Sequence, residues 1–331
     1  MRSASNSSVV YENKQSEVRS MLHPVKSGPK KGKIPKNTVA RQKRTNTIVA
    51  YLFLAPVVLI ALVFSVFPIL YSFGLSLFQW DMLTSGPQFV GLRNYEELIS
   101  SGELYHTLWQ TTIYCFFTVV PSVIIGLSFA LLLDRKFRGI GFYRSLFLTP
   151  MLVSSVAISS IWMWLFHNDY GAINELLGLV GIQPIPWLNS ADTALWAVII
   201  MGIWSNVGFV MVLYIAGLQN ISNDLIEAAR MDGAGTWTII QKIKVPLLAP
   251  TTFVIIVTQT IDQYLTFASI DTLTGGGPAN STRLMVSLLY EKAFQTFEMG
   301  YASAISVIIF IVVLILTLIN LKIGNKKVFY R

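Results

Sequence analysis

A regular series of polar side chains in the last third of the sequence could bind a hydroxyl-rich molecule. The series interrupts an apolar stretch, residues 247–270, at the spacing i, i+3, i+4 and i+7, and consists of Gln259, Asp262, Gln263 and Thr266. This spacing predicts one polar face on an α-helix. Because a charge inside hydrocarbon is costly, a carboxylate such as Asp262 in a membrane-spanning helix marks a functional site by default. We expect the face to line a wet cavity or, alternatively, to form hydrogen bonds with a partner helix.

The preceding apolar stretch, residues 193–218, carries groups that suit the same kind of ligand. Ser205 and Asn206 can exchange hydrogen bonds with hydroxyl groups, as the carboxylate and amides of the first series can. Trp204 and Phe209 supply aromatic rings, which pack against the apolar faces of sugar rings. Together the two stretches have the chemistry that would hold a neutral polyol.

Between these two stretches lies a less apolar loop, residues 222–246, that predicts two short helices. Asn223-Asp224 can cap the first helix, and Gly233 supplies the turn that follows it. A second, amphipathic helix would then lead to Pro246, where the next apolar stretch begins. The loop is therefore expected to be a compact pair of helices.

The first of these helices carries small residues beside a carboxylate. Ala228 and Ala229 would let a partner surface approach closely, and Glu227 would orient that surface through a charged contact. The same two helices could instead serve only to connect two membrane spans. The residue types alone leave docking and connection equally open.

Composition and hydropathy predict a helical membrane protein. The 331 residues are 53% hydrophobic and only 13% charged, whereas a soluble domain carries about 25% charged residues. Six apolar runs reach the ~20 residues needed to span hydrocarbon; they are residues 47–70, 108–133, 145–166, 193–218, 247–270 and 300–321. The expected fold class is an all-α integral membrane protein with six transmembrane helices and a cytoplasmic helical loop.

The distribution of Lys and Arg predicts the orientation and the domain boundaries. If the N-terminus lies inside, the cytoplasmic segments hold 22 of the 25 basic residues, in keeping with the positive-inside rule. Both termini are therefore expected in the cytoplasm. The organisation expected is a disordered basic tail over residues 1–46, a six-helix domain over residues 47–325 and a C-terminal tail over residues 326–331.

The net charge of +8 does not indicate a nucleic-acid partner. The segment 1–46 alone holds 11 basic and two acidic side chains, and it is poor in apolar residues. Such a segment cannot form a core and is attracted to anionic lipid headgroups. We expect contact with membrane lipid and no binding of nucleic acid; alternatively, the segment could be a regulatory or partner-binding arm.

The residue patterns of enzymes and metal sites are not apparent. Cys115 is the only cysteine, which excludes an intrachain disulfide and a Cys-based metal cluster. The three histidines show no pairing at helical spacing, and no nucleophile motif, phosphate-binding glycine loop or catalytic carboxylate pair is found. We therefore expect no catalytic residue, no metal and no cofactor in this chain.

Two strings of residues resemble the permease subunits of binding-protein-dependent ABC importers. The first comprises Glu227-Ala228-Ala229, Gly233 after three residues, and Ile243-Lys244-Val245-Pro246 after nine more. It is similar to the coupling-loop motif of that family, which usually has Leu where this chain has Val245. The second begins Leu273-Thr-Gly-Gly-Gly-Pro278 and is similar to the sugar-importer, MalF-like branch of the MetI-like superfamily. The resemblance covers about residues 47–325.

The resemblance implies a type I ABC importer permease fold and a multiprotein assembly in the bacterial cytoplasmic (inner) membrane. The partners implied are a second homologous permease subunit, a cytoplasmic ABC ATPase dimer that binds ATP and Mg, an extracytoplasmic solute-binding protein, and a sugar substrate. The residues it assigns to ATPase coupling are Glu227, Ala228, Ala229, Asp232, Gly233, Ile243 and Pro246. In the resembling subunits the substrate site lies on the helices that flank this loop, which here implies Gly202, Asn206, Phe209, Gln259, Asp262, Gln263 and Thr266.

Other transport functions stay open. An ion-coupled secondary carrier could use Asp262 as its relay, although six spans without an inverted repeat argue against it. Among ABC importers, the solute could instead be a glycerophosphate, an amino acid or a polyamine. No Lys or Arg lies within a predicted span, which disfavours an anionic substrate.

Overall fold

A computed structural model describes residues 36–82, 86–134 and 138–327, and the chain divides into two compact units, Met1–Val66 and Phe67–Arg331. In the first unit, helix α2 (Lys36–Ala61) continues as the π-helical turn η1 (Leu62–Val66). The helix begins inside the predicted disordered tail, so residues 36–46 are helical, contrary to that expectation. They include the good helix formers Lys, Arg, Gln and Ala, which lets the apolar helix extend into the basic segment. Residues 1–35 lie outside the described part, and disorder there stays a prediction.

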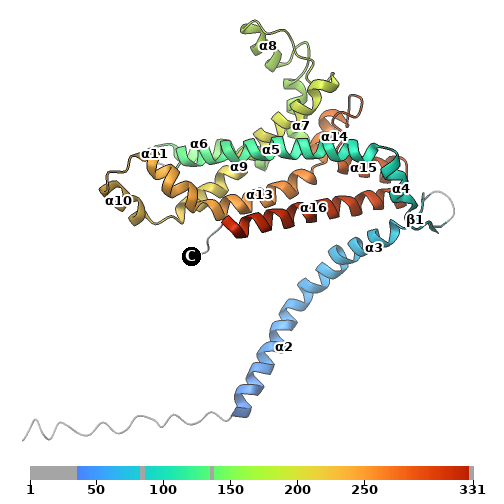
Figure 1. Ribbon diagram of the computed structural model, residues 1–331, viewed down its shortest axis with the longest axis horizontal. Helices are drawn as coiled ribbons and strands as arrows, with labels where there is room; N and C mark the ends of the chain where they lie inside the picture. The colour runs from blue at the N-terminus through green and yellow to red at the C-terminus, as the bar shows by residue number, and fades with distance from the viewer. Residues whose placement is uncertain (1–35, 83–85, 135–137, 328–331) are drawn as a thin grey trace, which may run out of the picture. The chain divides into compact units, whose positions relative to one another are not determined.

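The second unit is built around a bundle of long helices. They are α3 (Phe67–Leu75), α5 (Glu103–Leu132), α9 (Ala191–Gln219), α13 (Ala249–Tyr264) and α16 (Met299–Lys327). Helix α5 packs along α9 and α13, and α16 packs against α13 and α3 (Figure 1). Met211, Tyr214 and Ile255 are fully buried in the core. Helix α16 reaches Lys327, two residues into the predicted C-terminal tail, and residues 328–331 lie outside the described part.

A bend interrupts one predicted span, and a second bend lies at the start of another. Helices α6 (Ile140–Leu152) and α7 (Ser155–Leu165) meet at 100°, and the segment Thr236–Leu247 meets α13 at 59°. Of the described residues, four helices are long and apolar enough to cross a membrane, or six spans if each bent pair counts as one. A single helix over residues 145–166 was therefore a wrong expectation. Val153 is extended, and Ser154, a residue type that favours the position before a helix, is the N-cap residue that precedes α7.

The short elements gather mainly at the two ends of the bundle (Figure 1). At the end that we call the loop end are α10 (Asn223–Met231), α11 (Thr236–Ile239), η2 (Ile240–Lys244) and α12 (Val245–Leu247). At the opposite end are β1 (Phe78–Gln79), β2 (Gln88–Phe89), α4 (Arg93–Ser100), α15 (Met285–Tyr290) and η3 (Glu291–Gln295). The two strands pair antiparallel, with Phe78 opposite Phe89. Helices α8 (Ala172–Leu179) and α14 (Ala268–Thr274) both pack against α7.

Ion pairs tie the opposite end together. The guanidinium group of Arg283, a residue only 9% exposed, donates to Glu103 Oε1 and to Glu291 Oε2, each at 3.0 Å. Lys292 Nζ lies 3.8 Å from Glu103 Oε2 and 3.6 Å from Glu298 Oε2. The start of α5 is thus bound to the segment between α14 and α16.

Candidate functional site

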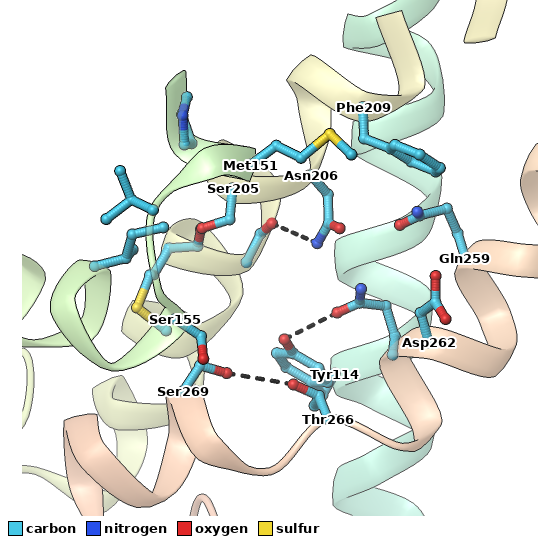
Figure 2. A pocket seen from close by; sticks show the side chains of 16 residues that line it. Tyr114, Met151, Ser155, Ser205, Asn206, Phe209, Gln259, Asp262, Thr266 and Ser269 are labelled. Carbon is cyan, nitrogen blue, oxygen red and sulfur yellow. Dashed lines mark hydrogen bonds between the residues drawn. The ribbon is translucent and has the colours of Figure 1, made fainter. Parts of the chain in front are cut away.

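A cavity of about 370 Å³, lined by both polar and apolar side chains, lies between α9 and α13 (Figure 2). It is lined by α5, by the break between α6 and α7, by α9, by α13 and by the segment that follows α13. The structure brings all seven residues of the expected substrate path to its wall: Gly202, Asn206, Phe209, Gln259, Asp262, Gln263 and Thr266. Residues about 60 positions apart in the chain therefore meet around one space.

The α9 wall offers hydrogen-bond acceptors to the cavity. Asn206 Nδ2 donates to Gly202 O at 2.8 Å, and Ser205 Oγ donates to Met201 O at 2.9 Å. Both side chains therefore direct a donor to their own helix, which leaves the Asn206 carbonyl and the lone pairs of Ser205 for a ligand. Phe209 adds an apolar ring to the same wall (Figure 2).

The α13 wall carries the amides and the carboxylate. Gln259 is only 2% exposed, and its Oε1 has no hydrogen-bond partner among the described residues. A buried carbonyl without a partner costs about 1–3 kcal/mol, and a ligand hydroxyl in the cavity would relieve that cost. Asp262 lies beside Gln259, is solvent-exposed and forms no ion pair among the described residues (Figure 2).

One member of the polar series does not lie on the helix. Helix α13 ends at Tyr264, so Thr266 falls in the connection to α14, not at position i+7 of a continuous helix. The backbone leaves helical geometry at Leu265, with φ −95° and ψ 4°, and Phe267 is also non-helical, with φ −141° and ψ −66°. The connection nonetheless returns Thr266 to the cavity wall, where its hydroxyl lies 3.3 Å from Ser269 Oγ.

The structure adds wall residues that the sequence reasoning missed. Tyr114 of α5 donates its hydroxyl to Gln263 Oε1 at 3.0 Å, which anchors that amide in the wall. Met151 and Ser155, on either side of the α6–α7 break, also line the cavity. Ser155 begins α7, and the first turn of a helix leaves backbone N–H groups unbonded. The run Thr-Pro-Met-Leu-Val-Ser-Ser at residues 149–155 was the available signal, because Pro and Ser interrupt an apolar stretch there.

Trp204 does not join this wall. Its ring packs edge-on against Trp162, with the centroids 5.7 Å apart, and the residue is 48% exposed. Phe209 is thus the aromatic member of the predicted pair that faces the cavity.

The expected pair of loop helices is formed, with one difference at its start. The side chain of Ser222 accepts from Asp224 N, so Ser222 is the cap of α10, one residue earlier than expected. Gly233 adopts φ +80°, a left-handed conformation that favours glycine, and makes the turn after α10. The second helix is short and passes from α11 into the π-helical turn η2.

The loop presents a surface with almost no internal packing. No residue of α10 is buried, and Met231 and Trp237 are 88% and 68% exposed. Of the seven predicted coupling residues, Ala229 and Ile243 are half-buried, and the exposed ones are Glu227, Ala228, Asp232, Gly233 and Pro246. Exposed apolar side chains in the same short loop as an exposed carboxylate are typical of a surface that binds a partner protein.

Comparisons with known proteins agree with the motif. Residues 104–328 match the family model described as "Binding-protein-dependent transport system inner membrane component". The chain is 34% identical to the trehalose/maltose transport system permease protein MalF of Thermococcus litoralis, over 88% of this chain and 98% of that protein. It is 35% identical to the probable ABC transporter permease protein YurN of Bacillus subtilis, over 84% of this chain and 96% of that protein. It is 32% identical to the sn-glycerol-3-phosphate transport system permease protein UgpA of Agrobacterium fabrum, over 86% of this chain and 97% of that protein.

The fold also resembles a solved structure. A chain of a bacterial ABC transporter involved in the import of the acidic polysaccharide alginate superposes with a TM-score of 0.75. The alignment covers 87% of this chain and 98% of that chain, at 19% sequence identity. At this identity the likeness concerns the fold alone, so the contents of the cavity have to be argued from its own residues.

Proposed function

The chain belongs to the family of binding-protein-dependent transport system inner membrane components, and from that premise we propose that it is the permease subunit of an ATP-driven importer of a neutral sugar or oligosaccharide. The names of the relatives support import of a small polar solute but differ in what that solute is, from a disaccharide to a glycerophosphate. The solute therefore has to be inferred from the cavity.

The observation that carries the sugar proposal is the composition of the cavity wall. Its polar groups are amides, hydroxyls and the carboxylate of Asp262, and neither Lys nor Arg is among the described residues that line it. Amides and carboxylates bind hydroxyl groups, whereas phosphate and carboxylate ligands are usually held by Arg or Lys. Asp262 would also repel an anion. A neutral polyol with one apolar ring face, placed against Phe209, fits this wall best.

The coupling proposal rests on the shape of the loop. Helix α10 projects from the bundle with Glu227 and Ala228 exposed, and the turn at Gly233 holds its C-terminal end. We infer that the ATPase dimer receives this helix and binds the ATP and Mg. The other partners that we infer are a second homologous permease, a solute-binding protein on the extracytoplasmic side of the membrane, and membrane lipid. We infer that the loop and both termini lie in the cytoplasm of a bacterium.

Uptake of labelled solutes into cells that carry the whole transporter tests both parts. Glu227→Ala and Gly233→Asp should abolish ATP-dependent uptake and reduce the ATPase that co-purifies, because they alter the docking surface. Lys242→Ala is the matched control: it lies exposed in the same loop and should transport normally. If the Glu227 and Gly233 variants transport normally with ATP depleted and a proton gradient intact, the importer proposal is wrong. An ion-coupled carrier with Asp262 as its relay would then be the better account.

The substrate class is tested separately with Asp262→Asn. A panel of labelled maltose, trehalose, sn-glycerol 3-phosphate and a uronic-acid oligosaccharide should show uptake of a neutral member by the unaltered protein. The variant should change the preference among neutral sugars or lose uptake, whereas the matched control Asp271→Asn, an exposed carboxylate outside the cavity wall, should not. Unchanged uptake by Asp262→Asn would assign the polar face to helix packing. Uptake of only the anionic members would refute the neutral-sugar proposal.

A further inference from the structure

One ion pair joins the loop to the bundle among the described residues. Lys244, the last residue of η2, binds Asp134, which lies two residues beyond the end of α5. The side chains of Lys244 and Asp134 are 16% and 26% exposed, so the pair is partly shielded from water and attracts more strongly than a surface pair. The two residues are 110 positions apart in the sequence.

A second cation holds the same end of α5. Arg144 of α6 donates from Nη2 to Leu133 O at 3.0 Å. Carbonyl groups at the end of a helix have no partner within the helix and carry partial negative charge, which cations stabilise. The end of α5 is therefore bound to α6 by Arg144 and to the loop by Lys244.

The loop has few other rigid contacts with the bundle. No residue of α10 is buried, whereas Ile239 at the end of α11 is 4% exposed and Leu248 just after α12 is 1% exposed. Leu248 belongs to the same core cluster as Tyr214. Helix α10 is joined to the bundle at both ends: residues 220–222 connect it to α9, and the segment from Ile239 to Leu248 leads to α13. A force applied to α10 reaches the bundle through both connections, and in the second of them Lys244 supplies the ion pair to the end of α5.

Helix α5 leads from this contact to the cavity. It is helical from Glu103 to Leu132, and at 1.5 Å per residue it is about 45 Å long. Within it, Tyr114 donates the hydrogen bond that anchors Gln263 in the cavity wall. At its start, Glu103 accepts from Arg283. One helix thus carries the loop contact, part of the cavity wall and the ion pairs of the opposite end.

We propose that the Lys244–Asp134 ion pair transmits movement of the loop to α5, so that the loop and the cavity wall shift together in the transport cycle. Lys244 and Asp134 are positioning residues, since neither lines the cavity. The proposal rests on the proposed function, because it takes a partner ATPase to be what moves α10.

The test is a charge reversal and its rescue in the complete transporter, co-expressed with its permease, ATPase and binding-protein partners and reconstituted in liposomes. Lys244→Glu and Asp134→Lys should each lower sugar-stimulated transport by at least about five-fold, while the complex still retains its ATPase. The double variant should recover most of the loss, because the pair is restored with opposite polarity, and Lys244→Arg should transport normally. Lys242→Glu makes the same charge change in the same loop at an exposed residue with no ion pair among the described residues, and should have little effect.

The outcomes separate the alternatives. Normal transport by both single reversals, or a double variant no better than the worse single one, would overturn the proposal. Loss of the ATPase from the single variants would overturn it too, since the pair would then hold the docking surface and not transmit movement. If a reversal does not accumulate in the membrane, Lys244→Gln and Asp134→Asn remove the pair without introducing repulsion. Each should lower transport and the double variant should be no worse than the single ones, whereas normal transport by both single variants, or losses that add in the double variant, would overturn the proposal. A failure of the proposed function looks different: Glu227→Ala would then leave ATPase retention and transport unchanged, whatever the Lys244 variants show.

Discussion

The close approach of α9 to α6 predicts that Gly208→Ala will destabilise the protein. A Cβ at Gly208 would collide with Phe147 O of α6 and would lie 2.9 Å from Phe147 C and 3.6 Å from Leu148 N. The neighbours are backbone atoms of a helix, so no side chain can rotate away to make room. The variant therefore requires α6 to move away from α9, or else it strains the backbone of both helices.

The size of the effect follows from this geometry. Overpacking a close contact costs about 1–3 kcal/mol, and the backbone on both sides places Gly208→Ala in the upper half of that range. In a chain of 331 residues each kcal/mol lowers Tm by about 1.5–2 °C, less than in a domain of 150–250 residues, so we expect Tm to fall by about 3–6 °C. Because α6 leads to Met151 in the cavity wall, transport should fall as well.

Thermal unfolding of the detergent-purified protein measures this directly, with Gly141→Ala as the control. Gly141 lies in the same helix α6, and a Cβ there would meet nothing within 4 Å. Alanine at such a position favours the helix by up to about 1 kcal/mol, so the control should leave Tm unchanged or raise it. A Tm for Gly208→Ala equal to that of the unaltered protein, or an equal fall in Gly141→Ala, would refute the reasoning.

Three further predictions concern single contacts. Tyr114→Phe leaves Gln263 Oε1 in the buried wall without its donor, which should lower the free energy of unfolding by about 1–3 kcal/mol and so lower Tm. A Tm equal to that of the unaltered protein would mean that this hydrogen bond does not stabilise the fold. Arg283→Met leaves Glu103 without its 3.0 Å partner, and because that carboxylate is 31% exposed we expect a loss of about 1–3 kcal/mol that Arg283→Lys partly restores, measured by the same unfolding assay. Gly233→Ala forces an alanine into the left-handed conformation at φ +80°, which should destabilise the turn by about 1 kcal/mol. We expect faster proteolysis in the loop with an unchanged Tm of the whole protein.

Much of the architecture could be predicted because its signals are local in the sequence. Runs of about 20 apolar residues predict helices that cross a membrane. The loop pattern from Glu227 to Pro246 could be recognised because it lies within one short segment. The residues of the substrate path could be selected for a related reason: a helix places positions three and four apart on one face, which brings Gln259, Asp262 and Gln263 together wherever the helix lies.

What lay outside such local rules was decided by the tertiary structure. The class of protein, the approximate spans and the chemistry of the polar residues could be predicted without the fold, because each follows from neighbours within a few turns of one helix. Only the packed structure decided that the run at residues 145–166 bends by 100° and that α13 stops before Thr266. It also decided that Tyr114 reaches Gln263 across 149 positions and that Lys244 meets Asp134 across 110. These contacts depend on which helices touch and how closely they approach, and the absence of a side chain at Gly208, which lets α9 approach the backbone of α6, is one residue that sets that distance.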